Sequence, residues 1–224
     1  MTYSFDFSWI GEYLPVLLKG VGITVELILV GAFFGVALGT LCAWIRALGP
    51  LWLRPVVGAY VEMIRNTPFL IQLFFIFFGL PSLGFRMSEL QAANLAMIVN
   101  LGAYSCEIIR AGIQATPRGQ FEAGASLAMS PIQTFWHVVL IPSLQRIWPA
   151  LSSQIVIVML GSAAVSQIAA EDLTFAANFI QSRNFRAFEA YLVSTVIYLF
   201  LAIVLRQLLR GAGALLFAKR RAAQ

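Results

Sequence analysis

Long apolar runs, separated by short polar segments, dominate the chain. A helix needs about 20 residues to cross about 30 Å of hydrocarbon, and five stretches reach that length, namely residues 16–44, 56–80, 88–115, 147–170 and 187–217. The apolar residues in each stretch run continuously and do not alternate with polar ones, which favours helices over the strands of a membrane barrel. The pattern therefore predicts an all-α membrane protein with about five transmembrane helices.

The composition excludes a soluble globular domain. Hydrophobic residues make up 60% of the chain and charged residues only 11%, with a mean hydropathy of +0.84, whereas soluble domains carry about 25% charged residues. Residues 1–11 contain Asp6 but no Lys or Arg, so they lack the basic start of a signal peptide. We expect the first span to stay in the mature protein.

The basic residues predict the orientation of the bundle. If the N-terminus lies outside, only four of the 15 Lys and Arg residues face outward and the other 11 are cytoplasmic. The four outer residues are Lys19, Arg86, Arg183 and Arg186. Cytoplasmic loops are enriched in Lys and Arg, so this bias favours an outer N-terminus and a cytoplasmic C-terminus. No basic stripe is interleaved with aromatic residues in a soluble segment, so we expect no nucleic-acid partner.

Small residues in the predicted spans are interpreted as packing positions. Gly31, Gly35 and Gly39 recur every four residues and share one face of the first span, as in faces where two membrane helices approach closely. Cys42 and Cys106 fall within spans and have no metal-ligand spacing around them, so they are expected to act as small apolar residues.

The longest stretch between spans, residues 116–146, is predicted to form two short helices and is called the elbow below. Pro117 suits the first position of one helix. Ser130 followed by Gln133 is a capping box for the second helix, which is expected to end before Pro142. From periodicity alone, the elbow is either an interfacial anchor or a docking element for a cytosolic partner.

At these residues the chain resembles the permease subunits of ABC importers, whose fold is called MetI-like. Those subunits share a Glu-Ala-Ala, then Gly, then Ile-x-Leu-Pro pattern in this loop, and this chain has EAGASLA at 122–128 and VVLIP at 138–142. The polar amino acid branch, which includes histidine, glutamine and arginine permeases, is suggested by three more stretches. They are GITVEL at 22–27, YVEMIRNTP at 60–68 and YSCEIIRAGIQ at 104–114.

The resemblance implies a permease subunit of an ATP-driven, binding-protein-dependent importer in the bacterial inner membrane. It implies a periplasmic segment 1–15, a membrane domain 16–217 with coupling loop 116–146, and a cytoplasmic tail 218–224. Partners would be a cytosolic ATPase dimer that carries the ATP and Mg²⁺, a second permease subunit, a periplasmic amino-acid-binding protein and membrane lipid. This chain would hold no cofactor and catalyse no reaction, and it has no phosphate-binding loop motif. The residues expected to couple to the ATPase are Arg118, Gly119, Gln120, Glu122, Ala123, Gly124, Leu127 and Ala128.

The chain departs from the family pattern at four places. Gly124 stands where a second Ala is usual, Ala128 stands where Gly is usual, and Pro142 comes one residue late. In the fourth span, similar proteins often carry Lys-Asp-Thr-Ser where this chain has Leu-Gly-Ser-Ala at 160–163. Since the charged pair is absent, recognition of a charged substrate has to rest on other groups.

The third span offers a polar face. Asn100, Tyr104 and Glu107 occur at i, i+4 and i+7 and therefore cluster on one side of a helix. An ionisable residue at membrane depth beside an amide and a phenol is a candidate for a substrate pathway. The alternative is a structural pair between Glu107 and Arg110 at the cytoplasmic end of the span.

Further pathway candidates lie in the first and fourth spans. Ser162 and Ser166 share a face next to Gly161, with Gln167 to the side, and we expect them to approach the polar face of the third span around a central cavity. Close packing of small residues across a dimer axis is the alternative. Glu26 is costly at membrane depth unless it faces protein or water, so it is either a structural anchor or a pathway residue.

Two single residues have structural interpretations. Pro68 is expected to kink the second span, with Thr67 available to satisfy the backbone groups that the kink frees. His137 has no metal partners nearby in the sequence and is expected at the surface.

Two other classes of function compete with the permease. A stand-alone secondary transporter or channel for a small polar solute would explain the hydropathy, but secondary transporters often show an internal repeat and none is visible in this chain. A membrane scaffold would also explain the hydropathy, but it would not explain the order of the motifs.

Overall fold

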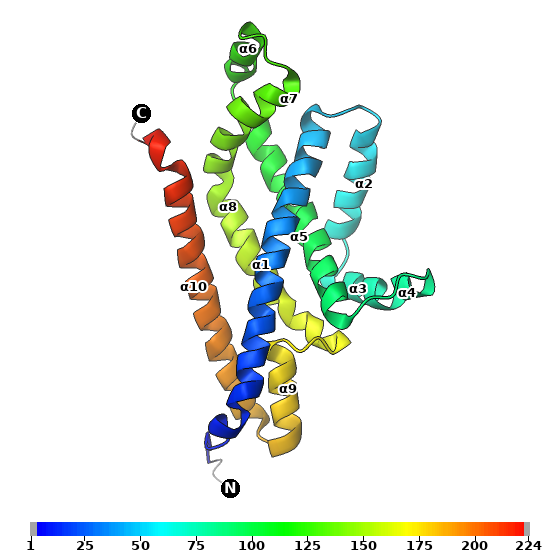
Figure 1. The fold of residues 1–224 in the computed structure, drawn as a ribbon, viewed down its shortest axis with the longest axis vertical. Helices are drawn as coiled ribbons and strands as arrows, with labels where there is room; N and C mark the ends of the chain where they lie inside the picture. The colour runs from blue at the N-terminus through cyan, green and yellow to red at the C-terminus, as the bar shows by residue number, and fades with distance from the viewer. Residues whose placement is uncertain (1–3, 222–224) are drawn as a thin grey trace.

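The computed structural model describes residues 4–221, with side chains to residue 217, and Figure 1 shows its helices. Residues 1–3 of the predicted N-terminal segment and the basic side chains of the predicted tail, Lys219, Arg220 and Arg221, lie outside the described residues. Residues 4–221 contain helices and no strand, as the sequence predicts. The helices are α1 (Ile10–Leu48), α2 (Leu53–Arg65), α3 (Phe69–Phe74), η1 (Phe75–Gly79), α4 (Leu80–Ser82), α5 (Glu89–Gln114), α6 (Arg118–Ser126), α7 (Pro131–Thr134), η2 (Phe135–Val139), α8 (Leu140–Gly161), η3 (Ser162–Ile168), α9 (Leu173–Asn184) and α10 (Ala187–Arg221).

Four segments are long and apolar enough to cross a membrane, and one bent pair makes a possible fifth. The four are Ile10–Leu48, Glu89–Gln114, Pro131–Ile168 and Ala187–Phe217. The long helices run along one common direction, with α9 and the start of α1 at one end and α6 and α7 at the other (Figure 1). These are called the N-terminal end and the elbow end. The prediction of about five spans is therefore confirmed.

The second predicted span is not one continuous helix. It consists of α2 and the segment Phe69–Ser82, which meet at 112°. Pro68 has no N–H and disfavours helical geometry in the residue before it, so the helix stops there. The Thr67 hydroxyl donates to the Met63 carbonyl at 2.8 Å, so it satisfies a backbone group that the break frees. The break is much sharper than the predicted kink.

The second helix of the elbow does not end before Pro142. The Ser130–Gln133 capping box is present, but the helix continues through the π-helical turn η2 into α8, so the fourth span begins well before residue 147. In η2 the Leu140 N–H bonds the Phe135 carbonyl. A π turn widens the helix and shifts its carbonyls, which provides room for the ring of Pro142 close behind it.

The stretch 171–186, which lies between the fourth and fifth predicted spans, contains α9. The Asp172 carboxylate caps this helix by accepting the Phe175 N–H at 2.8 Å. A Cβ at Gly20 of α1 would lie 2.9 Å from the Asp172 carbonyl oxygen, so α9 starts in direct contact with α1. Hydropathy missed this helix because it is too short to span, although Asp172 was a visible capping signal.

The glycine face of α1 packs closely against α5, as predicted. A Cβ at Gly35 would lie 3.0 Å from the Leu101 Cβ, and a Cβ at Gly39 would lie 2.5 Å from the Ser105 Cβ. Cys42 and Cys106 are buried and free beside this contact. The α1–α5 pair therefore forms the centre of the bundle, around which the candidate site residues are placed.

Candidate functional site

The tip of the elbow is formed by α6, an exposed helix. All residues of α6 are exposed except Phe121, which is half-buried, and Gly124, which is buried. Three large apolar side chains of the elbow are exposed, with exposed fractions of 75% for Leu127, 54% for Ile132 and 47% for Trp136. Exposed apolar side chains gathered at one tip, beside the charged Glu122, are typical of a docking surface.

Two of the four departures from the family motif, Gly124 and Ala128, lie at positions with special local geometry. A Cβ at Gly124 would lie 2.6 Å from both Cγ2 and Oγ1 of Thr134, so α6 lies against α7 at a distance that only glycine allows. Ala128 adopts a left-handed conformation with φ of 53°. It ends α6 in a Schellman motif, with the Met129 N–H bonding the Gly124 carbonyl at 3.0 Å and the Ala128 N–H bonding the Ala125 carbonyl at 2.9 Å.

A cavity of about 460 Å³ lies within the elbow, between the start of α6 and the start of α8. Arg146 crosses to the end of α5, where its Nη1 donates to the Ala115 carbonyl at 2.8 Å. His137 is exposed, as expected, and its Nδ1 lies 3.0 Å from the Gln133 carbonyl. Gln120 and Gln145 also line this cavity, so polar residues of α6 and α8 border it on two sides.

Asn100 faces the broken second span. Its Nδ2 donates to the Gln72 Oε1 at 3.0 Å, and both side chains are buried. The Gln72 Nε2 in turn donates to the carbonyls of Ile64 at 2.7 Å and Thr67 at 2.9 Å. Asn100 therefore fixes the amide that satisfies the carbonyl groups at the break between α2 and α3.

Glu107 lies among three arginines from three helices, which we call the Glu107 cluster. Its carboxylate accepts hydrogen bonds from Arg46 of α1 and from Arg110, whose Nη2 lies at 2.8 Å. The Arg65 Nη1 of α2 lies 3.8 Å from the Glu107 Oε2. The Arg65 guanidinium also lies over the Tyr104 ring, 5.6 Å from its centroid. The structure thus contains the Glu107–Arg110 pair, which was the alternative to a pathway role for Glu107, and it adds two arginines to that pair.

Among the described residues, the remaining pathway candidates form no hydrogen bond or ion pair with the polar face of α5. The Ser162 hydroxyl donates to the Met159 carbonyl at 2.7 Å, and the Ser166 hydroxyl donates to the Ala163 carbonyl at 2.9 Å. Both serines are buried, whereas Gln167 and Glu26 are exposed. Within this one chain, the two serines bond to their own helix, and the Asn100 and Glu107 side chains bond to α1, α2 and α3.

Sequence reasoning missed Gln72, Arg46 and Arg65 as members of these polar groups. Each is separated from its partner by 28 or more residues along the chain. A polar or charged residue inside an apolar run was the available signal, since Gln72 stands within FLIQLF. This signal identifies the polar residue but does not identify the residue with which it pairs.

The family model described as "Binding-protein-dependent transport system inner membrane component" matches residues 35–213. The chain belongs to this family. It is therefore an inner membrane component of a binding-protein-dependent transport system, and none of the matches given below is a stand-alone secondary transporter or channel.

Three relatives show how closely the chain follows the family. It is 36% identical over 197 residues to the probable amino-acid ABC transporter permease protein y4tF of Sinorhizobium fredii, covering 84% of this chain and 78% of the relative. The glutamine transport system permease protein GlnP of Escherichia coli is 32% identical over 208 residues, with 92% and 95% covered. The L-cystine transport system permease protein TcyB of Bacillus subtilis is 34% identical, with 77% and 74% covered.

Two solved structures share the fold. A crystal structure of an amino acid ABC transporter with histidines matches with a TM-score of 0.83 and 34% identity, covering 94% of this chain and 99% of that chain. An inward-facing structure of the MetNI methionine ABC transporter matches with a TM-score of 0.79 over the same shares of the two chains. Its identity is 19%, so it supports the fold alone, which is the predicted MetI-like fold.

Proposed function

We propose that this chain is the membrane-embedded half of an ATP-driven importer that carries a polar amino acid. The single observation that carries the proposal is the exposed α6 with its open apolar tip, in a chain of this family. The named relatives are permeases for glutamine, L-cystine and other amino acids, which supports this class of substrate. Two ATPase subunits would bind ATP and Mg²⁺, and a second permease and a periplasmic binding protein would complete the assembly.

The continuity of the elbow with α8 supports a mechanical role for it. Gly124 fixes α6 against Thr134 at the start of a helix that runs through η2 into α8. The 22 residues of α8 span about 33 Å at a rise of about 1.5 Å per residue. A movement of α6 by a closing ATPase would therefore reach Ser162 at the far end of α8 without crossing a loop, as rigid-body rocking requires.

The proposed orientation places the N-terminus in the periplasm and the elbow in the cytoplasm. Arg46, Arg65 and Arg110 all meet Glu107 near the elbow end, which supports the assignment of Arg65 to the cytoplasmic side. Single cysteines at Ser4, which is exposed, and at Ala223, outside the described residues, test it with an impermeant thiol reagent in intact cells. Labelling at position 4 alone is expected, and labelling at position 223 alone would reverse the orientation.

The substrate pathway is proposed to run where Gln167 and Glu26 meet a second permease subunit, with Ser162 and Ser166 buried next to Gln167 along the chain. Exposure of Gln167 and Glu26 in the single chain supports a site that two chains complete. Asn100, Tyr104 and Glu107 border it from α5, where Asn100 acts by fixing the break at Pro68. Asn100→Leu is therefore expected to weaken transport and leave ATPase binding unchanged.

Charge inversion at Glu122 tests the docking proposal. Glu122→Arg keeps helix propensity on an exposed helix, so the chain should insert and dimerise normally. The ATPase should no longer copurify, and binding-protein-stimulated ATP hydrolysis should fall at least tenfold, because inverting a charge at a docking surface costs more than about 1.4 kcal/mol. Glu89→Arg, an exposed inversion at the opposite end of α5, is the matched control. Hydrolysis and copurification at the parent level in Glu122→Arg would remove the proposed role of α6.

A further inference from the structure

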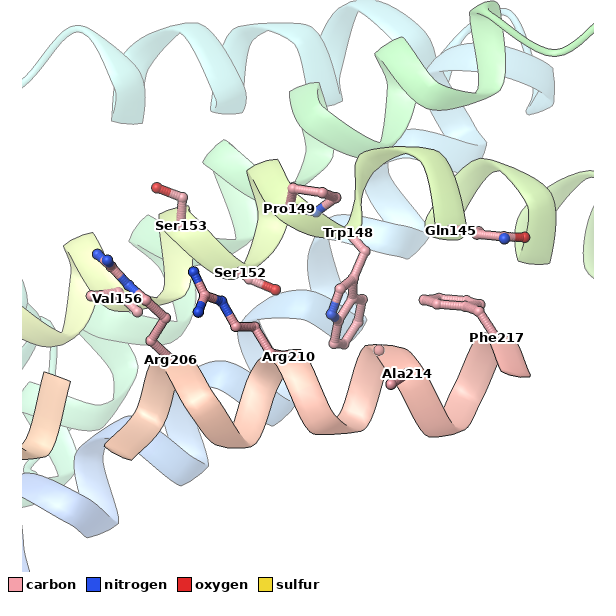
Figure 2. Close-up of a pocket in the computed structure, with 11 residues that line it drawn as sticks. Gln145, Trp148, Pro149, Ser152, Ser153, Val156, Arg206, Arg210, Ala214 and Phe217 are labelled. Atoms are coloured by element: carbon pink, nitrogen blue, oxygen red, sulfur yellow. The ribbon is translucent and has the colours of Figure 1, made fainter. Parts of the chain in front are cut away.

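A groove of about 500 Å³ lies between α8 and α10, and among its lining residues Gln145 also borders the cavity near α6. One wall consists of Gln145, Ser152, Ser153 and Val156 of α8, and the other carries Arg206 and Arg210 of α10. Figure 2 shows both arginine side chains projecting from α10 toward α8, with Trp148 and Phe217 at the opposite end of the groove.

The two arginines have no counter-charge in the part of the chain that the structure describes. They stand one turn apart on α10, both are exposed, and neither forms an ion pair or hydrogen bond with another described residue. Nearby, the Ser152 hydroxyl oxygen is buried behind the groove wall and has no hydrogen-bond partner among those residues either. Two unpaired guanidinium groups beside an unsatisfied hydroxyl favour an anion with several acceptor oxygens.

The groove is held in shape by its own packing. The Trp148 Nε1 donates to the Leu209 carbonyl at 2.9 Å, and the Trp148 and Phe217 rings pack edge to face with centroids 5.7 Å apart. A Cβ at Gly213 would lie only 2.3 Å from the Trp148 Nε1. Glycine therefore lets the indole lie against α10, and the walls beside the arginines are fixed before anything binds.

The arginines follow directly on residues 190–205 of α10, which contain no charged residue, so they fit the boundary between hydrocarbon and headgroups. Counted from Ala187, where α10 begins, Arg206 lies about 28 Å and Arg210 about 34 Å along the helix axis, and the hydrocarbon core is about 30 Å thick. Toward the membrane centre, α10 exposes Phe200 and Ile203. The groove thus offers positive charge at phosphate level and an apolar surface at the level of acyl chains.

We infer that this groove binds an anionic phospholipid of the inner leaflet. Its phosphate lies between Arg206 and Arg210, its acyl chains follow the apolar face of α10 toward the membrane centre, and its polar head faces Gln145. Basic pockets between membrane helices on the cytoplasmic side bind such headgroups. The choice of the inner leaflet rests on the proposed orientation, whereas the inference does not rest on the proposed import function.

Lipid binding to the full-length chain in nonionic detergent tests the inference. Delipidated protein is titrated with phosphatidylglycerol or phosphatidylcholine, and bound lipid is counted by native mass spectrometry. Phosphatidylglycerol should bind at least tenfold more tightly than phosphatidylcholine. Arg206→Gln and Arg210→Gln should each weaken phosphatidylglycerol binding about fivefold, since a basic residue near the surface contributes about 1 kcal/mol to such binding.

Three controls separate the groove from general effects of charge. Arg54→Gln removes one charge at the elbow end outside the groove and should change affinity less than twofold. Arg206→Lys keeps the charge and should retain most of the affinity, even if the double glutamine variant fails to fold. Inorganic phosphate should compete poorly with the lipid, because it lacks the acyl chains.

Several outcomes would overturn the inference. Equal affinity for the two lipids, equal losses in Arg54→Gln and Arg206→Gln, or full competition by inorganic phosphate would each exclude a phospholipid site. Ser153→Cys provides a further test, since Ser153 is exposed at the groove. A rapid disulfide between two copies at this position would show that a second subunit covers the groove instead of lipid.

Discussion

Neutralising Glu107 should destabilise the chain, because one carboxylate compensates three arginines. In Glu107→Gln, Arg46 and Arg110 lose a charged acceptor and Arg65 loses its nearest negative charge. Removing one partner of a buried ion pair costs about 3–5 kcal/mol, and an exposed pair contributes about 0–1 kcal/mol. The Glu107 side chain is 18% exposed and its partners are 21–38% exposed, so we expect a loss of about 2–3 kcal/mol.

The measurement is thermal unfolding of the purified chain in detergent, followed by loss of its monodisperse form. Glu62→Gln is the matched control, since Glu62 is exposed and pairs only with Asn66 at 3.1 Å among its side-chain contacts, and it should change stability by less than about 0.5 kcal/mol. In Arg110→Gln/Glu107→Gln the second change should cost less than it does alone, because one orphaned charge is gone. If Glu107→Gln were as stable as the parent but inactive in transport, a structural role for the Glu107 cluster would be refuted.

Three further changes have defined expectations, each measured by the same unfolding assay. Ala128→Gly should stabilise the elbow by about 1 kcal/mol, since glycine adopts the left-handed conformation at φ of 53° without the Cβ penalty; a loss of stability would contradict the assigned Schellman motif. Gly124→Ala should destabilise the chain by about 1–3 kcal/mol because its Cβ meets Thr134 at 2.6 Å. Thr134→Ala in the same chain should recover part of that loss, whereas additive losses would show that the two residues do not touch. Asp172→Ala should cost about 2 kcal/mol by removing the cap of α9 and the acceptor of the Tyr198 hydroxyl, whereas Asp172→Asn keeps the cap. Burial raises the pKa of Asp172 despite those hydrogen bonds. The stabilisation that depends on its protonation is therefore present below the ordinary carboxyl pKa and is lost as the pH rises through the raised value. Stability that falls with pH in the same way in Asp172→Asn would assign this pH dependence to another group.

The spans were predictable because hydropathy depends on local sequence alone. The third span was expected at 88–115 and α5 occupies Glu89–Gln114, with Ser88 as the N-cap. The fifth was expected to start at residue 187, where α10 begins. The glycine face of α1 was also readable, since a four-residue spacing of glycine has one main use between membrane helices.

The breaks and continuations were not predictable to the same degree. The sequence marks Pro68 and Pro142 in the same way, yet the first separates two helices at 112° and the second lies inside α8. The difference comes from their surroundings. Gln72 and Thr67 satisfy the open carbonyls at Pro68, whereas the π turn η2 accommodates Pro142 within a continuous helix.

The elbow motif was found from sequence, but the partners of the buried polar residues were not. A capping box involves residues three apart, so Ser130 and Gln133 identify each other. Asn100 and Gln72 come from different helices, and their pairing depends on how those helices cross. For the same reason the groove with Arg206 and Arg210 is visible only when α8 and α10 lie side by side.

Reconstituted transport tests the central proposal most directly. The chain is placed in proteoliposomes with its ATPase, the second permease subunit where the assembly needs one, and the periplasmic binding protein, and uptake of a labelled polar amino acid is followed. We predict that uptake requires ATP hydrolysis and the binding protein together, and that it is lost when Glu122→Arg replaces the parent chain. Uptake by this chain alone, driven by an ion gradient without ATP, would contradict the proposal.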